Sequence, residues 1–174
     1  MNRFRYLLWI CCACCTIIVS GQEVDSLVGE EVDRQVWFPF IQAFNNQDAA
    51  GFNALHSADV LRGGPWGLLI GEEYFARNIS SYSRSKASGN KRNLALVFES
   101  RIDRPGICYH VGYYRIISWG TDGEASEFYG YFHVVLRKVD GIWKITQDWD
   151  TSELSGMPVS TEDFAQAAGN GIYE

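Results

Sequence analysis

Two β-rich runs on either side of Asp140-Gly141 constrain the fold of this chain more than any other feature. An Asp-Gly pair between alternating apolar runs is a strong signal for a two-residue hairpin turn. The runs cover residues 128–139 and 142–150, which is enough for two long antiparallel strands. The chain should therefore contain a hairpin whose side chains alternate between two faces.

A two-residue turn sets Val139 opposite Ile142 and fixes the pairs farther from the turn. The pairs expected on one face are Leu136 with Ile145, Val134 with Gln147, and Phe132 with Trp149. That face is mostly apolar, so we expect it to be core. The pairs expected on the other face include His133 with Asp148 and Tyr131 with Asp150. A turn one residue longer would exchange the partners' faces.

The first 21 residues have the pattern of a secretory signal peptide. Arg3 and Arg5 precede an uncharged run over residues 6–19, and cleavage is expected after Gly21. The run is shorter than the ~20 residues of a membrane span, so a signal peptide is favoured over an anchor. We expect an exported protein, periplasmic or secreted, that has no contact with the membrane after cleavage.

Four of the five cysteines lie inside this apolar run. The residues before them suit lipidation poorly and the run continues beyond them, so a lipoprotein is the less favoured alternative. The mature chain keeps Cys108 alone, which excludes an internal disulfide. An unpaired thiol of this kind is usually buried and inert.

The mature chain is acidic and rich in aromatic residues. Loss of Arg3 and Arg5 leaves 13 basic against 21 acidic residues, a net charge of about −8. Such a charge argues against nucleic acid and anionic membrane surfaces as partners. An aromatic content of 14% suggests a large core, an aromatic-lined cavity or a dimer face.

Helices are expected to precede strands along the chain. Apolar spacing predicts helices at 30–45, 48–56 and 71–82, and strands at 94–102, 107–119, 127–139 and 142–150. Residues 60–70 are predicted to be a loop or a broken strand. Segregated helices and strands indicate an α+β fold, with a bent antiparallel sheet and three helices closing one side. Gly112 and Gly130 are candidate bend sites.

One domain is expected over residues 30–154. It follows a lead-in segment at 22–29 and precedes a C-terminal tail at 155–174, which includes a short helix near 161–168. About 150 mature residues fit a single domain.

The segments GYFHVVLRKVDGIWKI and FIQAFNNQDAAGFNALHS, in this order of elements, resemble the nuclear transport factor 2-like superfamily. The branch that they resemble is the polyketide-cyclase-like and ketosteroid-isomerase-like group of bacterial proteins. The resemblance implies a cystatin-like cone, in which a curved sheet and helices enclose a deep pocket. It also implies that isomerases, dehydratases, cyclases, binding domains and catalytically dead scaffolds are all candidates, and that the outer sheet face forms a homodimer.

Two departures from the steroid isomerases stand out. Those enzymes place a tyrosine on the first helix, where this chain has the stripe Val36, Phe40 and Phe44. They also place two acidic residues in the cone, whereas the expected hairpin register directs Asp148 and Asp150 outward. Their catalytic residues are therefore not carried over.

His110 and Tyr114 are the catalytic candidates. They alternate with the small residues Cys108 and Gly112, which suit the inner side of a bent sheet. If that side faces the pocket, His110 can act as a base near neutral pH and Tyr114 as a hydrogen-bond donor. The alternative is that Ile107, Val111 and their alternating neighbours face inward and His110 faces solvent or a partner.

Three further residues are candidates for the pocket wall. Gln147 is the lone polar residue on the expected inner face of the last strand, and Trp149 follows two residues later on the same face. Trp66 lies in a Gly-Gly-Pro-Trp-Gly loop. A buried amide must be hydrogen-bonded, so Gln147 serves either a ligand or a structural neighbour. The alternative for Trp66 is a plain turn with a buried indole.

The remaining histidines favour structural roles. His133 with Asp148 is expected to be a surface or dimer ion pair, and His56 is expected to meet the C-terminal dipole of a helix. The histidines have no metal-ligand spacing, so we expect no metal and no cofactor.

Three functions remain after this reading. The leading one is an exported domain that binds a small, mostly apolar molecule in a cone-shaped pocket. The alternatives are a lyase or isomerase that uses His110 as base, and a non-catalytic dimeric interaction module whose cone is plugged by Phe132, Trp143 and Trp149.

Overall fold

The structure, a computed structural model, describes residues 21–174. The signal peptide expected at the N-terminus therefore lies outside the described residues, apart from Gly21. The helices are α1 (Gly21–Val32), the π-helical η1 (Asp33–Trp37), α2 (Phe38–Asn45), α3 (Ala49–Ala54), α4 (Glu72–Ala87), α5 (Thr161–Ala167) and the 3-10 turn η2 (Ala168–Asn170). The strands are β1 (His56–Gly64), β2 (Gly67–Ile70), β3 (Lys91–Arg104), β4 (Ile107–Trp119), β5 (Ala125–Val139), β6 (Ile142–Thr151), β7 (Glu153–Leu154) and β8 (Met157–Pro158).

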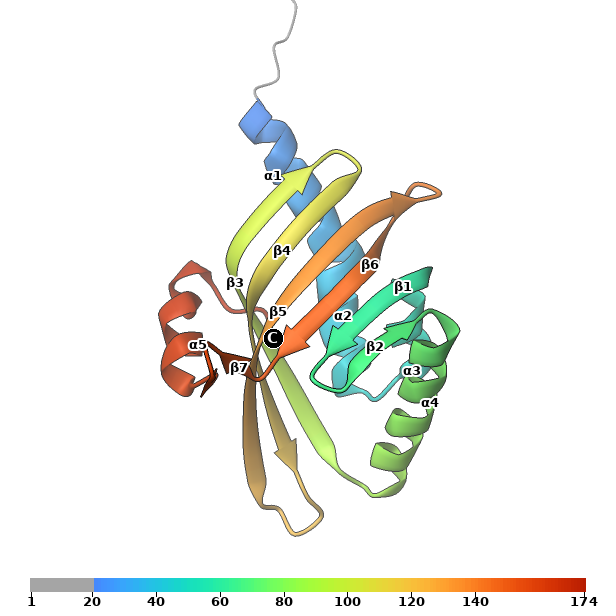
Figure 1. The fold of residues 1–174 in the computed structure, drawn as a ribbon, viewed down its shortest axis with the longest axis vertical. Coiled ribbons are helices and arrows are strands. Elements are labelled where there is room, and N and C mark those ends of the chain that lie inside the picture. Colours follow the sequence, from blue (N-terminus) through green and yellow to red (C-terminus); the bar gives the residue numbers. More distant parts are fainter. Residues whose placement is uncertain (1–20) are drawn as a thin grey trace, which may run out of the picture.

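A curved six-stranded sheet in the order β2-β1-β6-β5-β4-β3 forms the body of the molecule, and helices α1 to α4 cover one side of it (Figure 1). The predicted α+β class is confirmed. The antiparallel meander from β3 to β6 is also confirmed, and the limits of β4 match the prediction. No described helix has the length and apolar character that crossing a bilayer requires.

The sheet is mixed, because β1 pairs with β6 in parallel. Residues 60–70 were expected to be a loop or broken strand, and an all-antiparallel sheet was expected. The all-antiparallel expectation is wrong, whereas the broken strand fits residues 60–70, where β1 and β2 are interrupted at Pro65 and Trp66. The segment forms most of the β1–β2 hairpin, which places Arg62 on β1 opposite Asp148 of β6. Glycines at the ends of these strands hid the strand pattern.

The first helical region starts earlier than expected and changes its pitch in the middle. The segment expected as a lead-in is the helix α1, and η1 follows it without a break. Pro39 sits at the start of α2 and lacks the N–H that a continuous α-helix needs. The π-helical turn, in which the Phe38 N–H bonds to the Asp33 carbonyl, accommodates that loss. It also directs Trp37 into the core, where the ring is 2% exposed.

A β-bulge divides the hairpin of β5 and β6. The pairs Val139–Ile142 and Leu136–Ile145 lie as predicted, but the register then shifts by one residue. Thr146 is the extra residue, and its hydroxyl donates to the Val135 carbonyl at 3.1 Å. Beyond the bulge, the pairs are Val135 with Gln147, Val134 with Asp148, His133 with Trp149, and Phe132 with Asp150. The predicted faces of residues 147–150 are therefore wrong, and the His133–Asp148 pair does not form.

The C-terminal tail is more ordered than the predicted loop. The expected short helix forms as α5, with a capping box between Ser160 and Asp163. Helix α5 lies on the side of the sheet away from α2 to α4 (Figure 1). Its Phe164 packs with Val97 and neighbouring rings. The tail then reaches the β3 edge, where Tyr173 exchanges two backbone hydrogen bonds of 2.9 Å with Leu96.

Candidate functional site

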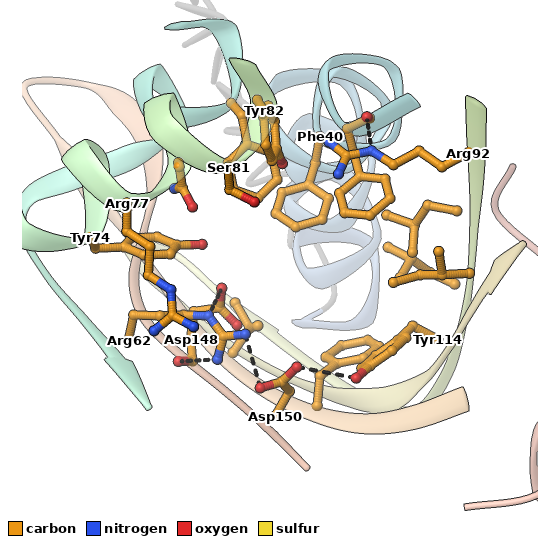
Figure 2. A pocket seen from close by; sticks show the side chains of 18 of the residues that line it. Phe40, Arg62, Tyr74, Arg77, Ser81, Tyr82, Arg92, Tyr114, Asp148 and Asp150 are labelled. Carbon is orange, nitrogen blue, oxygen red and sulfur yellow. Dashed lines mark hydrogen bonds and ion pairs between the residues drawn. The ribbon is translucent and has the colours of Figure 1, made fainter. Parts of the chain in front are cut away.

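A cavity of about 300 Å³ lies between the helices and the concave face of the sheet (Figure 2). Helices α2, α3 and α4 form one part of its wall, and strands β1, β3, β4, β5 and β6 form the rest. Its lining residues are Trp37, Phe40, Phe44, Phe52, Arg62, Trp66, Tyr74, Arg77, Asn78, Ser81, Tyr82, Arg92, Leu94, Leu96, Tyr114, Ile116, Phe132, Val134, Asp148 and Asp150. The site is thus an aromatic chamber with a limited set of polar groups, as is usual for small-molecule pockets.

Aromatic rings pack against one another on the helical side of the cavity. Phe40 and Phe52 lie 4.6 Å apart between ring centroids, and Tyr82 lies 5.5 Å from Phe52. Trp37 extends this wall toward the sheet through Phe40 at 5.8 Å. Because the rings hold one another in place, this wall is largely formed before any ligand enters.

Tyr114 lies across the sheet because its cross-strand neighbour is a glycine. It pairs with Gly130 on β5, and a Cβ at that position would fall 2.3 Å from the phenol ring. The hydroxyl then reaches Asp150, to which it donates a hydrogen bond of 3.1 Å. Burial, together with the nearby Asp150 carboxylate, raises the pKa of Tyr114, so the phenol is protonated at neutral pH. Tyr114 lines the cavity, in one of the two orientations that the sequence left open for this strand.

A cluster of Arg62, Asp148 and Asp150 occupies one wall of the cavity (Figure 2). The guanidinium of Arg62 lies 2.9 Å from Asp150 and 3.4 Å from Asp148. Burial alone would raise the pKa of Asp148, but the charge of Arg62 and the contact with His56 outweigh it and hold that pKa below its usual value. Both charges of the buried Arg62–Asp148 pair therefore persist at neutral pH.

The bulge at Thr146 is what brings the two aspartates into the cavity. Without it, Gln147 and Trp149 would face inward, as the sequence predicted. With the bulge, Gln147 and Trp149 line a shallow hollow on the outer face of the sheet, and Trp149 is 43% exposed. The predicted pocket positions of Gln147 and Trp149 are wrong for this reason.

Trp66 lines the cavity as predicted, at its rim. It is 42% exposed and lies in the turn between β1 and β2. The guanidinium of Arg77 stacks over its ring at 4.0 Å. A cation on the indole face holds the ring in place at the opening.

His110 faces inward, but it lies behind the cavity and is not among the lining residues. Its ring is fully buried and stacks on Trp37, whose Nε1–H donates to Nδ1 at 2.9 Å. The indole can only donate, so Nδ1 carries the lone pair and Nε2 carries the proton. Nε2 then donates to Asp103 at 2.8 Å. The lone pair that a catalytic base needs is already occupied by Trp37.

Asp103, Cys108 and His110 are the described residues whose ligand atoms come close enough to suggest a metal site, within 4.8 Å of one another. The hairpin of β3 and β4 brings them together, although their spacing in the sequence gives no such signal. The proton on Nε2 of His110 leaves no lone pair on that atom for a metal. Burial raises the pKa of the Cys108 thiol to about 12, so it stays protonated. This group is therefore built as a hydrogen-bonded cluster and does not fit a metal.

His56 interacts with the end of α3, as expected. Its Nδ1 lies 2.9 Å from the Phe52 carbonyl, which can only accept, so Nδ1 is the donor. Its Nε2 lies 3.9 Å from Asp148. His56 thus links α3 to the charged wall of the cavity.

Sequence reasoning missed the charged residues of the site, among them Arg62, Arg92, Asp148 and Asp150. The arginines belong to a hidden strand and to the first residues of β3, where nothing in the local pattern marks a pocket. The aspartates were assigned to the outer face by the unbroken register.

No protein-family model matches the sequence, and no curated protein matches it. The fold, by contrast, is similar to that of solved structures of other proteins. A putative dehydratase from the NTF2-like family of Streptomyces avermitilis superposes with a TM-score of 0.61 at 15% identity, over 78% of this chain and 98% of that one. A ketosteroid isomerase-like protein from Erwinia carotovora atroseptica gives 0.55 at 14% identity, over 74% and 95%. A Catenulispora acidiphila protein in complex with S-DNPA gives 0.58 at 15% identity, over 72% and 93%.

The chain thus has the nuclear transport factor 2-like fold, as its two quoted motifs suggested. The likeness covers almost the whole of each of these proteins. At these identities it defines the fold, and the site itself must indicate the function.

Proposed function

We propose that this protein binds a small, mostly apolar molecule in the cavity. The observation that carries the proposal is the cavity itself, which is open, about 300 Å³ in volume, and walled by aromatic rings with one charged cluster. That volume lies at the lower end of ligand pockets and suits a molecule of one or two rings. The complex of the Catenulispora acidiphila protein with S-DNPA adds support, because the same fold there holds a small molecule.

The plugged cone that an interaction module requires has little support. Of the three side chains expected to fill it, Phe132 alone lines the cavity. The indole of Trp143 donates instead to Glu31 of α1 at 3.0 Å, and Trp149 lies on the outer face.

Two substitutions on α4 test the binding proposal without touching the core. Ser81 lines the cavity and Ser83 does not, and both are exposed. Ser81→Trp sets an indole into the cavity wall, whereas Ser83→Trp adds the same ring elsewhere on the helix. Calorimetry with 2-naphthol should show at least tenfold weaker binding for Ser81→Trp and unchanged binding for Ser83→Trp. Equal loss in both variants, or no binding to the unaltered protein, would contradict the proposal.

A second candidate function is a lyase- or isomerase-type enzyme, favoured by the Tyr114–Asp150 contact. Asp150 is a carboxylate on the cavity wall, and Tyr114 is a hydrogen-bond donor beside it. Together they could accept a proton from a substrate and steady the resulting anion. His110 is less suited to the role of base, because Trp37 occupies its lone pair.

Deuterium exchange separates the enzyme from the binding protein. The protein is incubated in D₂O with β,γ-unsaturated ketones and β-hydroxy ketones, and label at carbon is measured by mass spectrometry. The enzyme predicts exchange that Asp150→Asn abolishes while 2-naphthol still binds. Exchange that persists in Asp150→Asn excludes that residue as the base.

Export and dimerisation complete the proposal. Export is supported by the basic and apolar pattern of the first 21 residues, and the intact mass of the mature protein tests it, with Gln22 as the expected first residue.

A dimer through the outer sheet face is supported by Tyr109 and Trp149, which are 44% and 43% exposed there. Light scattering of the Trp149→Glu variant tests it, with dissociation expected.

A further inference from the structure

Arg92 is held in the cavity wall without a charged partner. Its guanidinium lies 3.8 Å from the ring centroid of Phe44 and 4.1 Å from that of Tyr82, two rings that stand nearly perpendicular to each other. Its Nε–H donates to the Phe44 carbonyl at 2.8 Å. The Tyr82 hydroxyl is the other polar group that acts on the guanidinium. Nη2 is buried and has no hydrogen-bond partner.

The carboxylates of the cavity are paired without Arg92. Arg62 lies within ion-pair distance of both Asp148 and Asp150, while Arg92 lies across the cavity from them next to Tyr82 (Figure 2). Arg77 is exposed, and its guanidinium stacks on Trp66. Among the described residues, no carboxylate comes within ion-pair distance of Arg92.

An unpaired cation in such a place has a cost. Burial lowers the pKa of Arg92, although the Tyr82 hydroxyl acts in the opposite direction. The two rings and the Phe44 carbonyl offset part of the lost hydration, but none of them carries a negative charge. Buried charges are normally paired, so the partner missing from the chain is expected to come from outside it.

We infer that the ligand of this cavity is a small carboxylic acid, whose carboxylate pairs with the guanidinium of Arg92 and whose apolar body lies among the rings. The inference rests on the proposed binding function and narrows it to one class of ligand. A guanidinium edge offers two parallel N–H donors, the geometry that a planar carboxylate accepts. The far end of the acid then meets Tyr114 and Asp150, which favour a hydroxyl or another donor there.

Matched pairs of probes test the charge directly. The probes are 2-naphthoate and its neutral isostere 2-naphthamide, measured by calorimetry at pH 7 on the unaltered protein and on Arg92→Gln. Arg84→Gln is the control, because Arg84 lies on α4, is exposed, does not line the cavity, and its side chain donates to Ser80 of the same helix. Arg92→Lys keeps the positive charge and removes the two parallel N–H donors of the guanidinium.

The acid should bind roughly 10- to 100-fold more tightly than the amide, as expected for a hydrogen-bonded charge pair. Arg92→Gln should remove that preference and leave the affinity for the amide within about threefold, which also shows that the cavity is intact. Arg92→Lys should retain part of the preference, and Arg84→Gln all of it.

Two other results would overturn the inference in different ways. Equal binding of acid and amide, or a preference that survives in Arg92→Gln, refutes the carboxylate and leaves the binding proposal standing. Failure of both probes to bind refutes the inference and the binding proposal together.

Discussion

Two clusters of charged side chains lie on opposite sides of Trp37. Behind it, away from the cavity, His110 and Asp103 continue through Arg101 to Asp33 and Tyr173. In front of it, Arg62 joins Asp148 and Asp150, and Tyr114 completes the group. Each cluster contains arginine, two aspartates and tyrosine, yet their surroundings differ.

The rear cluster borders no cavity wall of the site, although the side chains of Arg101, Asp33 and Asp103 are 18%, 17% and 13% exposed. It ties η1, β3, β4 and the C-terminal tail together, since Tyr173 accepts from Arg101 at 2.7 Å and donates to Asp33 at 3.0 Å. The front cluster borders an open cavity of about 300 Å³. The same residue types thus tie elements together in one place and border a cavity with space for a ligand in the other.

The largest effect is expected from His110→Ala. The substitution empties a fully buried site and leaves the Trp37 indole N–H and Asp103 without their partner. The free energy of unfolding should fall by about 3 to 5 kcal/mol, measured by urea denaturation. His133→Ala, on the exposed outer face, should stay within about 0.5 kcal/mol. A loss below about 1 kcal/mol for His110→Ala would remove the stabilising role of the rear cluster.

A pair of tyrosine-to-phenylalanine variants compares the clusters directly. Tyr173→Phe breaks two charge-assisted hydrogen bonds in the rear cluster and should cost about 2 kcal/mol. Tyr114→Phe breaks one bond, to Asp150, beside a cavity from which water can replace the phenol, and should cost less than about 1 kcal/mol. Thermal unfolding measures both, with Tyr109→Phe on the outer surface as control. The reverse order would contradict the assignment of the two clusters.

Between pH 5 and 7.5, the pH dependence of stability should come from the rear cluster. Burial lowers the pKa of His110 despite the hydrogen bond to Asp103. As pH falls below about 6.5, the unfolded imidazole binds a proton before the folded one does, so stability decreases from that point downward. The loss can reach about 1.4 kcal/mol per pH unit. It is followed at more acidic pH by that from Asp103, whose pKa burial would raise but His110 and Arg101 hold below its usual value.

His110→Gln isolates this titration. A glutamine amide can accept from Trp37 and donate to Asp103, as the neutral imidazole does, but it does not ionise in this range. Urea denaturation at several pH values between 5 and 7.5 should therefore show a flatter profile for His110→Gln than for the unaltered protein. His133→Gln should keep the original slope. An unchanged slope in His110→Gln would assign the pH dependence to other groups.

The sequence was sufficient for the fold and for half of the hairpin. The Asp140-Gly141 turn fixed the register as far as Ile145, and helical spacing located α3 and α4, with Asp48 capping α3 through a 3.0 Å hydrogen bond from the Gly51 N–H. These features are local, so turn chemistry and periodicity determine them. The aromatic-lined cavity, one of three outcomes that the composition left open, is also present.

The charged wall of the cavity could not be predicted in the same way. The bulge at Thr146 leaves no mark in the sequence, because Trp143, Ile145 and Trp149 keep a period of two across it. Hydropathy then assigns Asp148 and Asp150 to solvent, which is the usual rule for a half-buried strand. The cavity wall breaks that rule, since Asp148 and Asp150 face inward and Arg62 of β1 forms ion pairs with both of them.

The smallest expected effect tests this register. Gln147→Ala changes a half-buried side chain on the outer face, opposite Val135, and should alter neither stability by more than about 0.5 kcal/mol nor the affinity for 2-naphthoate. In the register without a bulge, Gln147 would line the cavity, and its loss would weaken binding. Asp150→Asn is the matched variant beyond the bulge, and it should change the affinity for ligands with a donor group at the Tyr114 end. A loss of affinity in Gln147→Ala with none in Asp150→Asn would restore the unbroken hairpin and move the aspartates back to the outer face.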